Sequence, residues 1–102
     1  PVRPVSPAPI TPAAARIDVA AALSSARTEV SQGQIEVALQ HYEQVVRANT
    51  SIAEVVVDLQ KLTETESGKR NPAVHRLMGD GLMRQGKLQA ALDVYRKALR
   101  ML

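Results

Sequence analysis

Residues 71–102 carry the pattern that most constrains the fold of this chain, because two apolar runs at helical spacing meet at Gly86. A glycine between two such runs predicts two helices joined by a tight turn. Small residues occur where the two helices would approach each other, and larger ones occur where space must be filled. The small residues are Gly79, Ala91 and Ala98, and the larger ones are Leu77, Leu82, Leu92, Tyr95 and Leu99.

This segment resembles a tetratricopeptide repeat. The residues at the signature offsets of that family are Gly79, Gly86, Ala91, Tyr95 and Ala98. His75 departs from the pattern, because it stands where the family prefers a large apolar residue. The resemblance implies a helical scaffold that binds other proteins, and it does not say which partner is bound.

Helix signals elsewhere predict an all-α chain of five antiparallel helices, over residues 12–32, 34–48, 52–66, 72–85 and 88–102. Thr11-Pro12 and Asn71-Pro72 each combine a capping residue with a proline suited to the first helical position. Ser51 and Glu54 have the spacing of a capping box. Residues 67–70 are expected to form a loop, and Gly33 is expected to end the first helix in the left-handed conformation.

The domain organisation follows from the same signals. Residues 1–11 hold most of the prolines and predict a linker or tail, and residues 12–102 predict one helical domain. The resemblance implies that its hairpins form a right-handed stack, as in a short solenoid. One hairpin spans 16–48 and another spans 71–102, and their turns at Gly33 and Gly86 lie 53 residues apart, too far for one regular repeat. Whether residues 34–66 count as a degenerate middle repeat stays open.

Composition and charge narrow the possible functions. The chain has two Tyr, no Phe, no Trp and no Cys, so thiolate metal sites and disulfides are excluded. The net charge of +3 is uneven: residues 1–68 carry five basic and eight acidic groups, and residues 69–102 carry eight basic and two acidic groups. The basic groups lack aromatic neighbours on which bases could stack, which argues against nucleic acid. No apolar run is long enough to span a membrane. The compartment stays open, with the cytoplasm favoured.

Candidate catalytic groups are few. His41 and His75 are the only imidazoles, and no two histidines have the i, i+4 spacing of a helical zinc site. We interpret His75 as a partly buried packing residue and His41 as a solvated one. No serine lies in a nucleophile motif. We therefore expect no catalytic residue, no metal and no cofactor, and we expect that the protein is not an enzyme.

The candidate binding residues come from the resemblance. In that family the first helix of each hairpin lines a concave groove, and the residues that would face it here are Ala73, Arg76, Asp80, Met83 and Arg84. Some members hold a peptide carboxylate in this groove, and Asp80 stands where their pattern has Asn. The expected partner is a protein or peptide, bound as a segment or a helix.

An alternative function is self-association as a structural module of a larger protein. Helix 88–102 has apolar residues on more than one side, and its partner helix can cover only one of them. The residues expected on a self-association face are Leu92, Leu99, Met101 and Leu102. The opposite charges of the two halves of the chain would favour a homodimer in which two copies lie side by side in opposite directions.

Overall fold

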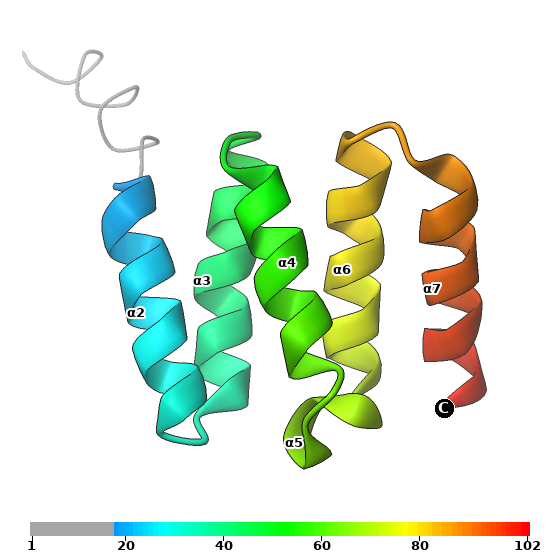
Figure 1. Cartoon of the computed structure of the whole chain (residues 1–102), viewed down its shortest axis with the longest axis horizontal. Helices are drawn as coiled ribbons and strands as arrows, with labels where there is room; N and C mark the ends of the chain where they lie inside the picture. The colour runs from blue at the N-terminus through cyan, green and yellow to red at the C-terminus, as the bar shows by residue number, and fades with distance from the viewer. Residues whose placement is uncertain (1–17) are drawn as a thin grey trace, which may run out of the picture.

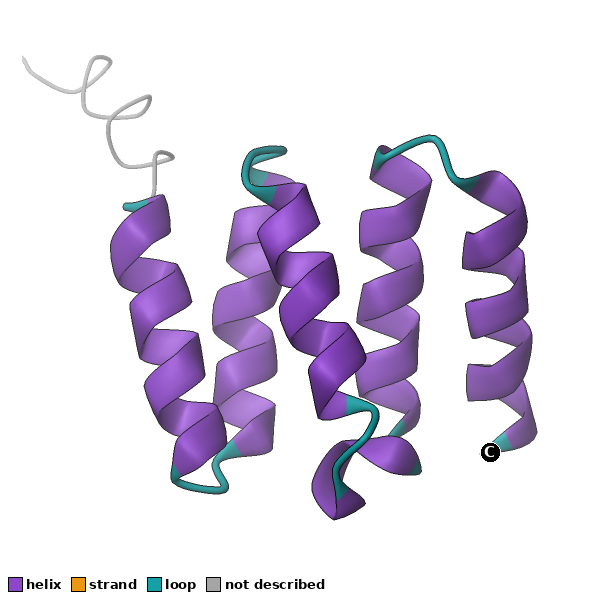
Figure 2. Ribbon diagram, in the orientation of Figure 1, coloured by secondary structure: helices purple, strands orange, loops and turns teal. Residues whose placement is uncertain are grey.

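The computed structural model describes residues 18–102, which form helices joined by turns and contain no strand (Figures 1 and 2). The helices are α2 (Val19–Ser31), α3 (Ile35–Arg47), α4 (Ile52–Leu62), α5 (Glu66–Lys69), α6 (Pro72–Arg84) and α7 (Leu88–Arg100). The predicted all-α class is therefore confirmed. The expected linker over 1–11 and the helix start at Thr11-Pro12 lie outside the described residues.

The helices form two hairpins with one long helix between them. α2 packs along α3, α6 packs along α7, and α4 lies across α3 and α6 in the view of Figure 1. α4 packs chiefly against α6. This pairing joins the two hairpins into one helical stack.

Local sequence signals explain most helix ends. The side chain of Asn71 accepts a hydrogen bond from the backbone N–H of Ala73 at 3.0 Å, and Pro72 occupies the first helical position, as expected. Gly33 and Gly86 have φ values of +79° and +77° and close the two hairpin turns. Only glycine adopts this left-handed conformation without steric cost, so both turns are encoded locally.

The segment between α3 and α6 differs from the prediction. Ser51 has a left-handed φ of +53° and its side chain makes no capping hydrogen bond, so the expected capping box with Glu54 is wrong. α4 ends at Leu62 instead of residue 66, and the expected loop over 67–70 contains the short helix α5. The hydroxyl of Thr65 caps α5 by accepting from the backbone N–H of Gly68 at 3.1 Å.

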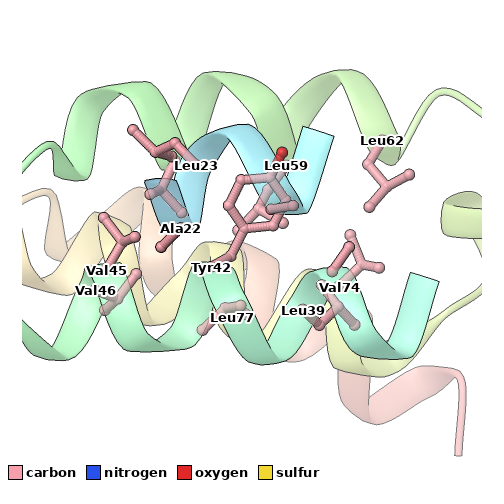
Figure 3. Packing of buried hydrophobic residues seen from close by; sticks show 13 residues of the cluster. Ala22, Leu23, Leu39, Tyr42, Val45, Val46, Leu59, Leu62, Val74 and Leu77 are labelled. Atoms are coloured by element: carbon pink, nitrogen blue, oxygen red, sulfur yellow. The ribbon is translucent and has the colours of Figure 1, made fainter. Parts of the chain in front are cut away.

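The core lies where α2, α3, α4 and α6 meet (Figure 3). Tyr42 of α3, Leu59 of α4 and Leu77 of α6 are among its largest buried side chains. Leu59 and Val55 of α4 are completely buried. Burial of these side chains supplies the main driving force for docking α4 onto its neighbours.

Gly81 explains how α4 comes so close to α6. A Cβ atom at this position would lie 2.8 Å from Cγ2 of Val56, well inside normal contact distance. Glycine is unfavourable inside a helix by about 1 kcal/mol relative to alanine. The close approach of α4 explains why glycine occupies position 81. The helical pattern of the sequence alone gives no reason for a glycine there.

The two hairpins are equivalent, although they are not consecutive. The bounds of α2 and α6 differ by 53 residues, and so do those of α3 and α7. Because the single long helix α4 separates the hairpins, α2 and α6 run in opposite directions (Figure 1). The chain therefore contains the same hairpin twice, turned around and bridged by α4.

Candidate interaction groove

The structure brings together most of the residues expected to face a groove. Arg76, Asp80, Met83 and Arg84 line an open groove of about 550 Å³. The fifth residue, Ala73, lies beside it and lines a smaller hollow of about 200 Å³ with Arg76. All five belong to α6, which is fixed between α4 and α7.

The groove has a second wall that the sequence did not reveal. Glu43, Val46 and Arg47 come from the last turns of α3, and Tyr95 comes from α7. The three residues of α3 lie beside α6 only because α3 packs against it. No local pattern predicts that contact, so the α3 wall is a product of tertiary structure.

A polar network involving Tyr95 and Asp80 anchors one side of the groove. The hydroxyl of Tyr95 donates a short hydrogen bond to the carboxylate of Asp80, and the guanidinium of Arg76 lies 3.3 Å from the same carboxylate. The ring of Tyr95 packs on Gly79, where a Cβ atom would lie 2.7 Å from Cε1 of the ring. Gly79 therefore permits the close helix contact that its position in the sequence predicts.

Positive charge at the groove is partly compensated. Arg47 pairs with Glu43 at 2.9 Å, and Arg76 pairs with Asp80. Arg84 makes no ion pair with any residue in 18–102, and the neighbouring Met83 is 45% exposed. The groove thus presents an exposed apolar side chain next to an uncompensated cation.

The first hairpin has a related but covered arrangement. The hydroxyl of Tyr42, the counterpart of Tyr95, donates to Asp58 of α4 at 2.9 Å. Nε of Arg27 donates to the same carboxylate at 2.7 Å, and Arg27 also reaches Glu54 of α4 at 3.4 Å. Here the tyrosine and its polar partners join the hairpin to a third helix.

Both tyrosines are held in their neutral form. Burial, followed by the hydrogen bond to the Asp80 carboxylate, raises the pKa of Tyr95 to about 12. Burial and the hydrogen bond to Asp58 raise the pKa of Tyr42 further above its usual range. In each case ionisation would put a phenolate next to a carboxylate.

We expect the raised pKa values of Tyr42 and Tyr95 to make the folded protein less stable in alkali. Because the tyrosine pKa is about 10 in the unfolded chain and higher in the fold, the stabilising contribution is complete below pH ~10. It is lost as the pH rises from ~10 toward 12, where Tyr95 ionises in the fold. Near-ultraviolet absorbance of tyrosinate should show midpoints above pH ~10 in the native protein and near 10 in urea. The chain has only these two tyrosines and no tryptophan, so the signal is specific. A native midpoint at the unfolded value would contradict the hydrogen bonds from the two tyrosines to Asp58 and Asp80.

The two histidines have structural contacts. His75 is buried, and its Nε2 lies 3.1 Å from the carbonyl oxygen of Lys69, to which it donates. This agrees with a packing role but with deeper burial than expected. His41 is only partly exposed, because its Nδ1 lies 2.7 Å from the Glu29 carboxylate and links α3 to α2. His41 is therefore less exposed than expected for a solvated residue, although its side chain still reaches solvent.

Within residues 18–102, no three His, Asp or Glu side chains gather in a way that could hold a metal ion. None of the helices in this range has the length and apolarity needed to cross a bilayer.

The outer side of α7 carries exposed apolar residues. Leu92, Leu99 and Leu102 are exposed, as expected for a self-association face, and so is Leu88. Met101 is half-buried. Ala91 and Ala98 are buried, as expected for the side that faces α6.

Comparison with known proteins gives no relative: no family model, no curated protein and no solved structure matches this chain.

Proposed function

We propose that this chain is a non-catalytic protein-interaction module that binds a peptide or a partner helix in the groove on α6. The observation that carries the proposal is the exposed Met83 beside Arg84, which has no ion-pair partner within residues 18–102, on a wall that also includes Arg76 and Asp80. Exposed apolar side chains bordered by charged groups are typical of interaction sites. The tetratricopeptide-like offsets of the second hairpin support the same function by analogy of fold.

Selection from a random-peptide library displayed on phage would test the groove. We expect peptides that bind the native chain and lose most of their affinity for Met83→Glu, because a charge would replace the apolar contact. Val57→Glu is the matched control, since Val57 is similarly exposed but lies on α4. Peptides that bind all three proteins equally, or a failure to select any peptide, would argue against the groove.

A second candidate function is homodimerisation through Leu92, Leu99, Met101 and Leu102. The observation that favours it is the exposure of the three leucines among them. Light scattering at several concentrations tests it, because a dimer would gain mass with concentration and Leu99→Glu would abolish the gain. A strictly monomeric mass would remove this candidate and leave the groove proposal intact.

A further inference from the structure

The equivalence of the two hairpins identifies one apolar stripe whose leucine positions are covered in the first hairpin and exposed in the second. The α7 stripe consists of Leu88, Leu92, Tyr95 and Leu99, which recur at alternating steps of four and three residues. The residues at the equivalent positions of α3 are Ile35, Leu39, Tyr42 and Val46. Such spacing places each set along one side of its helix, as in helices that pack lengthwise on another helix.

The exposure of the two stripes is very different. Leu39 and Val46 of α3 are 8% and 2% exposed, because α4 and α6 pack against this helix, and both side chains lie beside Leu77 of α6. Their counterparts Leu92 and Leu99 of α7 are 45% and 67% exposed. The fold thus shows, on its own first hairpin, that such a stripe is covered by helices.

We propose that the α6–α7 hairpin binds one amphipathic helix of a partner protein, which lies on the α7 stripe and along the groove, in the way that α4 contacts Arg27 and Tyr42 of the first hairpin. This inference rests on the proposed interaction function and specifies its ligand. Tyr95 lines the groove and belongs to the α7 stripe, so the two surfaces are continuous.

The apolar face of the partner follows from α4. Val55, Leu59 and Leu62 are the buried residues of α4 and are separated by four and three residues. A helix with large aliphatic residues at this spacing would present a matching row to the α7 stripe. Burying the two exposed leucines of that stripe would supply the apolar part of the binding free energy.

The charges of the partner must differ from those of α4, because the two hairpins differ at the polar positions. Asp80 of α6 is at the position equivalent to Arg27 of α2, the residue that binds Asp58 of α4. Arg84 of α6 is at the position equivalent to Ser31 of α2. A helix bound to the second hairpin therefore needs a neutral or basic residue in place of Asp58, and an acidic residue near Arg84.

A second copy of the chain is a poor occupant. The face of α4 that would match the stripe is already buried in each copy. Pairing α7 with the α7 of another copy would bring together helices that each carry Arg96, Lys97 and Arg100 against a single acid, Asp93. Like charges across an interface weaken it, so the observations favour a different, acid-containing helix.

Two synthetic helices test the inference against the intact chain. One has the native sequence of residues 51–65, and the other has the charges exchanged by Asp58→Lys and Lys61→Glu, so that the peptide net charge stays the same. In the native fold Lys61 lines a hollow with Arg27 and Val30 of the first hairpin. The equivalent residues of the second hairpin are Asp80 and Met83, and Met83 is next to Arg84. Fluorescence anisotropy of the labelled peptides should therefore show that the exchanged helix binds about tenfold more tightly, a difference of ~1.4 kcal/mol.

Variants of the chain locate the binding site and test the charge rule. Leu92→Glu with Leu99→Glu should abolish binding of the exchanged helix, whereas Val57→Glu should not change it. Asp80→Arg places in the second hairpin the residue that the first hairpin has at the equivalent position, Arg27. This variant should bind the peptide of native sequence more tightly, relative to the exchanged peptide, than the unchanged chain does. We expect the leucine variants to stay folded, because Leu92 and Leu99 are exposed in the native chain. Circular dichroism checks that each variant is folded.

Several results would overturn the inference: no binding of either helix to the folded chain, binding that survives Leu92→Glu with Leu99→Glu, or an unchanged preference in Asp80→Arg. A dimer that Leu92→Glu dissociates would show that a second copy occupies the stripe. The broader groove proposal fails separately. Phage-selected peptides that contain proline throughout and require Met83 but not Leu92 would support the groove and exclude a helical ligand.

Discussion

Leu59→Ala is expected to lower the free energy of unfolding by about 2–5 kcal/mol, the usual range for a buried leucine replaced by alanine. Leu59 is completely buried in the cluster where α4 meets α2, α3 and α6. The substitution removes apolar contacts and leaves a cavity that close-packed helices cannot fill. Because α4 bridges the two hairpins, the loss should affect the whole unfolding transition.

Leu99→Ala is the matched control, since it is the same substitution at a side chain that is 67% exposed. We expect its effect to stay within about 0.5 kcal/mol. Urea unfolding followed by circular dichroism measures both variants. Equal losses in the two variants would mean either that α4 does not pack as described or that α7 is covered in solution.

Ala91→Leu is expected to cost about 1–3 kcal/mol, because it inserts a larger side chain into a close helix contact. Ala91 is completely buried on the side of α7 that packs on α6. The neighbouring ring of Tyr95 already lies on Gly79, so little room remains between the helices. The same region holds the groove, and peptide binding should weaken as the helices move apart.

Ala90→Leu provides the control for this second prediction. Ala90 is adjacent in sequence and lies in the same helix, but it is exposed. Leucine and alanine both favour helices, so propensity contributes little to the difference. Thermal unfolding should show a lower midpoint for Ala91→Leu and a nearly unchanged one for Ala90→Leu. An unchanged midpoint in both would place Ala91 outside the contact.

Features that depend on neighbours in sequence were predicted correctly. The cap at Asn71, the left-handed conformation of Gly33, the turn at Gly86 and the buried Ala91 all follow from short-range geometry and helical periodicity. The α6 residues expected to face a groove came from the family resemblance, and four of the five line one groove in the structure.

Features that depend on distant contacts were not predictable. The predictions of a capping box at Ser51 and of a loop over residues 67–70 were wrong. The backbone conformation there depends on the path that the chain takes between α3 and α6, and a local capping pattern does not determine that path. The α3 wall of the groove, with Glu43 and Arg47, exists only because those helices pack together. The position of Gly81 acquires a reason only when Val56 of α4 lies against it.

The sequence by itself determined that two similar hairpins form and which side of each helix is apolar, because turn conformation and periodicity are local properties. Only the tertiary structure decided how those apolar sides are covered. α4 contacts the α3 stripe with Asp58 bound to Arg27 and Tyr42, whereas Leu92 and Leu99 of the equivalent stripe on α7 stay exposed among residues 18–102. That difference depends on which surfaces meet across long stretches of chain, and periodicity within one helix carries no information about it.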